Sequence, residues 1–275
     1  MADYKIVASD LDGTLLDSLG NLREENRRAI DALAERGVQF VPCTGRTLNE
    51  MNSDLRELPS IRYIIHSDGA VIYDKKTDRR ITMCMSREVA GHLFDVLADY
   101  TTYLSVRYNR NVYNDGAKQR DEIYDYFHID HYSRTAVIPM SNMVYDDFDA
   151  FCRSCEEIEM VGVFFHTIKE RDECIKRLEK TGNYLFARWE GLIYFEVFSA
   201  KAGKGNALLR LAEELGYDRA QTIGVGDSTN DATLIECAGL GLAMSNGFES
   251  LKRAADDVIC SNDEHAIQYI LEHYI

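Results

Sequence analysis

Residues 5–17 read K-I-V-A-S-D-L-D-G-T-L-L-D, and this stretch decides how the rest of the chain is interpreted. Residues 5–9 are a short run of the kind found in strands buried inside a parallel sheet. Two aspartates, Asp10 and Asp12, follow one residue apart, and then a glycine and a threonine. The chain carries 46 acidic residues and a net charge of −15, so two carboxylates crowded at the mouth of a strand call for a stabilising partner.

Around this strand, the first and last thirds of the chain alternate strand and helix patterns. Ala29, Ile30, Leu33 and Ala34 give one helix an apolar face, and Gly37 is a natural end for it. Further short apolar runs read as strands at residues 38–41, 62–65, 221–225, 240–243 and 258–260. Strands that alternate with helices and end in polar clusters predict the α/β class, with a doubly wound, Rossmann-like parallel sheet.

The middle of the chain has a different texture. Residues 84–192 are rich in tyrosine and phenylalanine, with alternating strand patterns at 102–107 and 160–165. Each of two helical patterns, at 87–100 and 170–180, is followed by extended segments, which suits an antiparallel sheet. We therefore expect a core domain formed by residues 1–83 and 193–275, with an α+β domain, residues 84–192, inserted into it.

Composition narrows the functional classes. A length of 275 residues suits two domains, and the strongly acidic balance argues against nucleic-acid or anionic-membrane partners. No apolar run is long enough for a membrane span, and the start reaches an aspartate too soon for a signal peptide. The seven cysteines are scattered, which favours a reducing cytoplasm, and Cys152 and Cys155 are interpreted as two thiols on one helix face. Oligomeric state stays open.

Polar residues gather after the predicted strands, in three groups: Asp10 and Asp12; Thr44, Gly45 and Arg46; Asp227, Asn230 and Asp231. The carboxyl ends of parallel strands share one crevice, so these groups are expected to converge. Two carboxylates about 4 Å apart repel by roughly 4 kcal/mol at an effective dielectric constant near 20. A hard divalent cation relieves this repulsion, and an all-oxygen site with few protein ligands favours Mg²⁺.

A lysine extends this interpretation from metal binding to phosphate chemistry. The stretch K-A-G-K-G-N places Lys201 and Lys204 just before a predicted helix. A lysine, a threonine hydroxyl and backbone donors at a helix start are the groups that bind phosphate. Together with Mg²⁺ they suit phosphoryl transfer, in which Asp10 can act as a carboxylate nucleophile.

Four ordered motifs, D-L-D-G-T-L, C-T-G-R, K-G-N-A-L and G-D-S-T-N-D, resemble those of the haloacid dehalogenase superfamily. The large insert between the second and third motifs resembles the α/β cap of its Cof-type phosphatases, as do E-V-F-S-A-K-A-G-K-G and A-D-D-V-I-C-S-N-D-E. The resemblance covers both core segments, whereas the cap matches by position and size. It implies a Mg²⁺-dependent phosphatase of small phosphorylated metabolites, acting through an aspartyl-phosphate.

The resemblance also implies a role for each matching residue. Asp10 would be the nucleophile and a metal ligand, and Asp12 would be the general acid and base and lend its backbone carbonyl to the metal. Asp227 would complete the metal site, with Asp231 supporting it or the lysine. The phosphate would be contacted by the Leu11 backbone, Thr44, Gly45, Lys204 and Asn230. Arg46 would either cap the site or form a surface ion pair, and Lys201, one step too early for the motif, would lie on the surface.

Four positions depart from the family pattern. Ser228 stands where asparagine is usual, and Asp68, in H-S-D-G-A, replaces another asparagine. Ser245 begins a changed Ser-Asn-Gly loop, and His265 stands where glycine is common. None of these changes removes a catalytic group, but Asp68 puts a carboxylate on the leaving-group side of the site. We interpret it as a supporting residue of the site, together with Asp231 and Arg46.

Other interpretations remain for individual features. Asp10 and Asp12 on their own could form a turn and a helix cap, and His66 could belong to the site or to the core. The cap aromatics are interpreted mainly as core or sheet face; they include Tyr103, Tyr108, Tyr113, Phe165 and Trp189. The stretch G-V-G-D-S-T lacks the third glycine of a dinucleotide-binding fingerprint, and K-A-G-K-G-N lacks the spacing of a nucleotide-binding P-loop. Two alternative functions remain. The protein could be a phosphomutase, or it could be a metal-binding phospho-acceptor domain that regulates without enzymatic activity. Sugar phosphates, flavin mononucleotide and pyridoxal phosphate all stay open as substrates.

Overall fold

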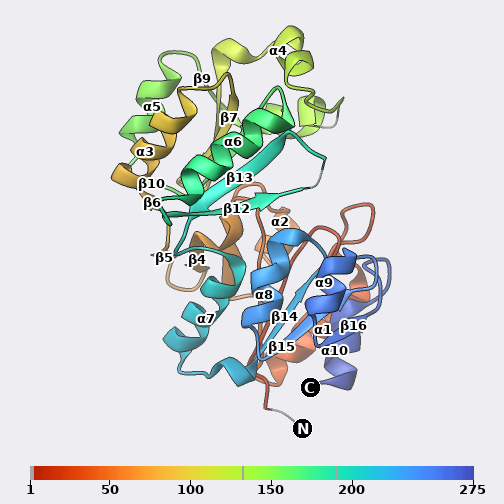
Figure 1. Ribbon diagram of the computed structural model, residues 1–275. Helices are drawn as coiled ribbons and strands as arrows, with labels where there is room; N and C mark the ends of the chain where they lie inside the picture. The colour runs from red at the N-terminus through yellow and green to blue at the C-terminus, as the bar shows by residue number, and fades with distance from the viewer. Residues whose placement is uncertain (1–2, 132, 190) are drawn as a thin grey trace. The chain divides into compact units, whose positions relative to one another are not determined.

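The computed structural model describes residues 3–131, 133–189 and 191–275, which form two compact units (Figure 1). Unit 1 comprises Met1–Arg46, Met51–Thr82 and Ala202–Ile275, and unit 2 comprises Thr47–Glu50 and Met83–Lys201. No helix in the described part of the chain combines the length and the apolar character needed to cross a bilayer.

Unit 1 contains a five-stranded parallel sheet in the order β16-β15-β14-β1-β2. Its strands are β1 (Ile6–Ser9), β2 (Gln39–Pro42), β14 (Thr222–Gly226), β15 (Leu240–Met244) and β16 (Asp257–Ile259). All four residues of β1 are buried, as a strand covered on both faces requires. The predicted α/β class and its parallel sheet are confirmed.

Helices follow most of these strands. They are α1 (Glu24–Glu35), α2 (Ser53–Arg56), α7 (Lys204–Leu215), α8 (Ala232–Cys237), α9 (Glu249–Ala254) and α10 (Ala266–His273). Short 3₁₀ turns occupy η1 (Ser67–Gly69), η5 (Arg219–Gln221) and η6 (Thr229–Asp231). Helix α1 packs against α10, and α7 packs against α8. The apolar face predicted for the first helix is buried through Ala29, Ile30 and Leu33.

One predicted strand of the core joins a different sheet. The run at 62–65 becomes β3 (Tyr63–His66), which pairs antiparallel with β4 (Val71–Asp74), itself paired with β5 (Arg79–Thr82). The link to β2 is reduced to a single parallel bridge between Cys43 and Ile65. The hairpin partner β4 satisfies the backbone groups that a further parallel neighbour would have used.

Unit 2 is built on a six-stranded sheet in the order β12-β13-β11-β7-β8-β9, antiparallel except for the β8–β9 pair. The strands are β7 (Tyr103–Tyr108), β8 (Asn111–Asp115), β9 (Asn142–Val144), β11 (Met160–Phe164), β12 (Tyr184–Arg188) and β13 (Tyr194–Ser199). Its helices are α3 (Arg87–Leu97), α4 (Asp121–Tyr126), α5 (Phe148–Ser154) and α6 (Ile168–Glu179). A two-stranded pair, β6 (Met85–Ser86) with β10 (Glu157–Ile158), and the turns η2 (Gly116–Lys118), η3 (Ser133–Val137) and η4 (Ile138–Met140) complete it.

The boundary of the insert differs from the one drawn from the sequence. Strand β13, expected in the core domain, pairs antiparallel with both β11 and β12 and so belongs to unit 2. The short stretch Thr47–Glu50 also joins unit 2, where the Asn49 backbone N–H donates to the Arg110 carbonyl (3.3 Å). Long-range pairing, which no local pattern reveals, decides both assignments.

The two faces of the unit 2 sheet are different. One face packs on α3, α5 and α6 through Val106, Val161, Val163, Phe195 and Val197 (Figure 1). Cys152 and Cys155 are buried in this same core, as expected for structural thiols, and burial raises the pKa of Cys155 to about 11. The alternate residues of the strands lie on the other face, which carries polar side chains, among them Ser105, Arg107 and Asn114.

Candidate active site

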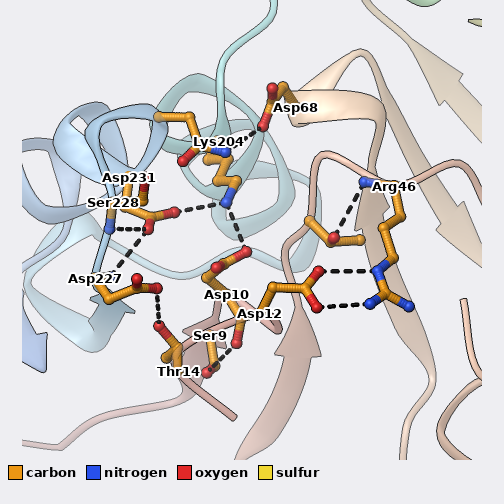
Figure 2. A network of polar contacts seen from close by, with 12 residues as sticks. Ser9, Asp10, Asp12, Thr14, Arg46, Asp68, Lys204, Asp227, Ser228 and Asp231 are labelled. Carbon is orange, nitrogen blue, oxygen red and sulfur yellow. Dashed lines mark hydrogen bonds and ion pairs between the residues drawn. The ribbon is translucent and has the colours of Figure 1, made fainter. Parts of the chain in front are cut away.

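The predicted site residues of unit 1 gather at the carboxyl edge of its parallel sheet. Ser9 lies opposite Pro42 on one side and Val225 on the other, so β1, β2 and β14 end at the same level. Asp10 follows β1 directly, Thr44 follows β2 after one residue, and Asp227 follows β14. Lys204 is the first residue of α7. Figure 2 shows Asp10, Lys204, Asp227 and Asp231 in one network of polar contacts.

Three carboxylates form the acidic centre of this network. Oxygens of Asp10, Asp227 and Asp231 all lie within 4.8 Å of one another, the one group among the described residues whose spacing could hold a metal ion. Burial, reinforced by Asp231 and opposed by Lys204, raises the pKa of Asp10 well above its usual range. Burial also raises the pKa of Asp227 to about 6. Both shifts are those of carboxylates short of positive charge, and the hard oxygen donors fit a divalent cation.

Lys204 places a positively charged side chain within the acidic centre. Its side chain is fully buried, and Nζ lies 2.7 Å from Asp10 Oδ1 and 2.6 Å from Asp231 Oδ1. Burial alone would lower the pKa of this ammonium group, but Asp10 and Asp231 raise it well above its usual range overall. The lysine is therefore held charged between the two carboxylates.

Asp231 also organises the loop that carries Asp227. Its Oδ2 accepts hydrogen bonds from the backbone N–H groups of Asp227 (3.0 Å) and Ser228 (2.9 Å). Ser228, where the family pattern has asparagine, thus keeps a backbone contact to the acidic centre. The predicted supporting role of Asp231 involves both the lysine and the loop.

Asp12 is engaged by Arg46 and not by the lysine. Arg46 Nε and Nη2 donate to Asp12 Oδ2 and Oδ1 at 2.8 and 2.6 Å, a two-pronged pair (Figure 2). The Asp12 side chain is 55% exposed and that of Arg46 is 30% exposed. Arg46 was expected either to cap the site or to form a surface ion pair. In the structure it forms a partly exposed ion pair with a predicted catalytic carboxylate.

Several of the predicted phosphate-binding residues contact Asp68. Leu11 and Thr44 are buried, and the Thr44 hydroxyl accepts from the Arg46 backbone N–H at 3.1 Å. A Cβ placed on Gly45 would lie 3.3 Å from Asp68 Oδ1, and Asn230 Nδ2 donates to the same oxygen at 3.0 Å.

Asp68 itself is buried and adopts a left-handed backbone conformation (φ 49°). It lies beside Gly45 and Asn230, two of the residues predicted to bind phosphate.

Two residues of the site were not singled out from the sequence. The Thr14 hydroxyl donates to Asp227 Oδ1 at 2.8 Å. Gly13 has a positive φ of 78°, and a Cβ there would lie 2.6 Å from Asp227 Oδ2, so only glycine lets the two segments approach. Both belong to the Gly-Thr pair that directly follows the two opening aspartates.

Other candidates lie apart from this network. His66 is buried, and its Nδ1 lies 3.0 Å from the Ser67 hydroxyl. Lys201 is exposed, as expected. The Ser245 backbone N–H bonds to the Cys260 carbonyl, and His265 Nδ1 lies 3.7 Å from Glu25. Ser245 itself lies outside the network, but the loop that it begins reaches Asp227: the Phe248 backbone N–H donates to the Asp227 carbonyl at 2.8 Å, and a Cβ on Gly247 would lie 2.8 Å from the same oxygen. His265 stands directly before α10.

Comparison with known proteins adds a family to this geometry. Residues 7–271 match the family described as haloacid dehalogenase-like hydrolase. The chain belongs to this family. Among its relatives, phosphatase YwpJ of Bacillus subtilis is 30% identical over 285 residues, covering 98% of this chain and all of the relative. The 5-amino-6-(5-phospho-D-ribitylamino)uracil phosphatase YwtE of the same organism is 26% identical, covering 98% of each chain.

A solved structure supports the same conclusion. A haloacid dehalogenase-like hydrolase from B. subtilis superimposes with a TM-score of 0.79 at 28% identity, covering 98% of this chain and all of that one. The expected Cof-type phosphatase of the haloacid dehalogenase superfamily is confirmed, and with it the expectation of an enzyme that hydrolyses phosphoric monoesters.

Proposed function

We propose that this phosphatase hydrolyses small phosphorylated metabolites through an aspartyl-phosphate on Asp10, with Mg²⁺ as its cofactor. The observation that carries the proposal is the buried contact of Lys204 with Asp10 and Asp231, beside Asp227, at the carboxyl edge of the sheet. A buried carboxylate held next to a lysine and a metal-binding group can approach an anionic phosphate, because the cations offset their mutual repulsion.

Asp10, Asp227 and the backbone carbonyl of Asp12 would hold the metal. Bound Mg²⁺ supplies positive charge that neutralises the phosphate oxygens and the acidic centre. Asp231 stays with Lys204 and the backbone of the 227–228 loop, so we assign it to orientation and not to ligation.

The reaction then follows from the positions of the two opening aspartates. A carboxylate oxygen of Asp10 bonds to phosphorus, and the ester P–O bond breaks with its electron pair on the leaving oxygen. Asp12 gives that oxygen a proton. In the second step Asp12 takes a proton from water, whose oxygen bonds to phosphorus, and the bond from phosphorus to Asp10 breaks to release phosphate.

The contact between Arg46 and Asp12 sets a condition on this cycle. Each carboxylate oxygen of Asp12 accepts one hydrogen bond from Arg46, and each keeps a second lone-pair site. We propose that Asp12 exchanges one of these contacts for the leaving oxygen when it delivers the proton, and that the freed guanidinium N–H groups then bind phosphate oxygens. We propose that Leu11, Thr44, Gly45, Lys204 and Asn230 contact the phosphate in the same complex.

The substrate is a small phosphate ester. Sugar phosphates, flavin mononucleotide and pyridoxal phosphate remain candidates, and the name of the relative YwtE adds 5-amino-6-(5-phospho-D-ribitylamino)uracil. We also propose that unit 2, as a cap, selects among such esters. A cytoplasmic location stays a prediction.

The decisive experiment is a phosphate-release screen over these esters, with chelator and Asp10→Asn controls. Multiple turnover that stops in chelator and in Asp10→Asn is expected. Isomerised substrate without net phosphate release would indicate a phosphomutase. Phosphorylation of the protein without turnover would indicate a regulatory phospho-acceptor.

A further inference from the structure

Three asparagine side chains hold the loop that follows β1 and carries Asp10 and Asp12. Within residues 13–16 of this loop, three backbone carbonyls each accept a hydrogen bond from an asparagine Nδ2. The three pairs are Asn246 with Gly13 (2.8 Å), Asn26 with Leu15 (3.4 Å) and Asn262 with Leu16 (3.0 Å). The asparagines lie in α1, after β15 and after β16, so three separate segments of unit 1 fix this loop.

A second contact fixes the orientation of two of these amides. Asn246 Oδ1 accepts from the Asn262 backbone N–H at 2.9 Å, and Asn26 Oδ1 accepts from the Ile267 backbone N–H at 3.0 Å. A backbone N–H can only donate and a carbonyl can only accept, so each Nδ2 must face the loop. Because an amide supplies both a donor and an acceptor, each of these side chains links the loop to another segment.

Asn246 is the asparagine whose contact lies beside the acidic centre. Its partner Gly13 lies against Asp227, because a Cβ on Gly13 would be 2.6 Å from Asp227 Oδ2. The next residue, Thr14, donates from its hydroxyl to Asp227 Oδ1 at 2.8 Å. Asn246 therefore acts on the Asp227 carboxylate through Gly13 and Thr14.

The loop that contains Asn246 also contacts Asp227 directly. The Phe248 backbone N–H donates to the Asp227 carbonyl at 2.8 Å. Gly247 is buried, and a Cβ there would lie 2.8 Å from the same carbonyl oxygen and 2.9 Å from the Asp227 Cα. Even an alanine side chain would push the two backbones apart, so the glycine of the Ser-Asn-Gly loop permits this close approach.

Three loops thus contact one another in pairs: the loop after β1, the loop with Asp227 after β14, and residues 245–248. In such a closed set, the separation of any two loops depends on the third. The separation that matters here is the one between Asp10 and Asp227, which we propose as metal ligands. Mg²⁺ requires near-ideal octahedral geometry, so a loop that is free to shift would bind it more weakly.

We propose that Asn246 is a positioning residue of the metal site. By holding the Gly13 carbonyl, it keeps the loop with Asp10 and Asp12 at the separation from Asp227 that one Mg²⁺ requires. Asn262 orients the Asn246 amide. The inference rests on the proposed phosphatase function and deepens it, because it assigns a residue that prepares the metal site.

The test measures Mg²⁺ binding to the whole chain by calorimetric titration without substrate. Asn246→Ala removes two contacts of an exposed side chain, so the fold should be retained. The Kd for Mg²⁺ should rise about 3- to 10-fold, as expected for the loss of one ordinary hydrogen bond. Asn142→Ala is the matched control, because the exposed Asn142 amide donates to the Val112 carbonyl (3.3 Å) in unit 2. Its Kd should stay within about twofold of the wild-type value.

Two further variants test the same loops independently. Gly247→Ala should also raise the Kd for Mg²⁺, because the added Cβ displaces the 245–248 loop from Asp227. Thr14→Val removes the hydroxyl contact to Asp227 and is combined with Asn246→Ala in a double-mutant cycle. If both residues act by placing one loop, the double variant should raise the Kd by less than the product of the two single effects. An increase equal to that product would contradict the shared action.

Phosphate release supplies a second readout. With p-nitrophenyl phosphate, Asn246→Ala should raise the Mg²⁺ concentration for half-maximal activity by the same factor as the Kd. Its kcat at saturating Mg²⁺ should stay within about twofold of the wild-type value, because the bound ion itself draws the loops together. A merely structural role would lower the free energy of unfolding and leave the Kd for Mg²⁺ unchanged.

Failure of this inference and failure of the phosphatase proposal give different results. If Asn246→Ala and Asn142→Ala bind Mg²⁺ with the same Kd while the wild-type chain releases phosphate, the positioning role is wrong and the phosphatase proposal stands. If the wild-type chain binds Mg²⁺ but turns over no ester, the phosphatase proposal fails, and the Kd of Asn246→Ala still decides the positioning role. If the wild-type chain binds no Mg²⁺, the positioning role is overturned.

Discussion

Lys204 Nζ lies 2.7 Å from Asp10 Oδ1 although 194 positions separate the two residues, and both are buried. Their contact joins the loop after β1 to the start of α7. The same ammonium group reaches Asp231, so three charges share one enclosed space. Removing the lysine leaves two buried carboxylates without a positive partner.

Lys204→Met should therefore cost both stability and activity. Breaking a buried ion pair from one side typically costs about 3–5 kcal/mol, and two carboxylates lose their partner here. Urea unfolding should show a loss of at least that size, and phosphate release should stop. Lys252→Met, which breaks an exposed pair with Glu249, is the control and should change stability by less than about 1 kcal/mol. Equal losses in the two variants would contradict the buried pairing.

Asp227 gives the apoprotein a pH dependence of known sign. Because folding raises its pKa from 3.8 to about 6, the folded state holds the proton more tightly than the unfolded chain. This contribution to stability is complete below pH 4 and disappears as the pH rises to about 6, a change of roughly 3 kcal/mol at most.

The free energy of unfolding, measured in chelator between pH 4 and 7, should show this decline. In Asp227→Asn the free energy of unfolding should fall less steeply with pH over the same range. Identical slopes for the two proteins would mean that Asp227 does not titrate in this window.

Metal removal tests the acidic centre directly. Chelator should abolish phosphate release, and added Mg²⁺ should restore it, because few protein ligands leave the ion exchangeable. Asp227→Ala should chiefly raise the Mg²⁺ concentration needed for half-maximal activity. Asp10→Asn should stay inactive at every Mg²⁺ concentration, and full activity in excess chelator would refute the metal's role.

Asp12 should matter most for poor leaving groups. An alkoxide leaves badly without a proton, whereas nitrophenolate hardly needs one, so Asp12→Asn should lose roughly two to four powers of ten on alkyl phosphates. With p-nitrophenyl phosphate, the first step should survive and the second fail. A burst of nitrophenol and phosphorylated Asp10 should then be detectable. Equal losses on both substrates without a burst would assign Asp12 to metal binding alone.

Asp68 should influence which phosphate esters are accepted. Its carboxylate contacts Asn230 and stands over Gly45, so it should disfavour additional negative charge on the substrate. Asp68→Asn keeps an oxygen for the Asn230 contact and removes the charge. The ratio of bisphosphate to neutral sugar phosphate turnover should rise, and an unchanged ratio would make Asp68 purely structural.

The sequence alone determined the chemistry of the strand ends. Apolar runs followed by Asp10, Thr44 and Asp227 predict a parallel sheet with polar residues at one edge. This was possible because a buried strand and its end are recognised from residues that are neighbours in the sequence. The order of the motifs added the family, and the comparisons confirmed it. The convergence of Asp10, Asp227 and Asp231 was expected from their places at this edge, although Asp231 was predicted to support the site and not to be one of its metal ligands.

Only the tertiary structure decided the contacts among these residues. The structure pairs Arg46 with Asp12 and brings Asp68 into contact with Asn230. Strand β13 pairs with β11 and β12 and so belongs to unit 2. Ion pairs, strand partners and cavities depend on residues far apart in the chain, and their energies are set by burial, which a local pattern does not contain.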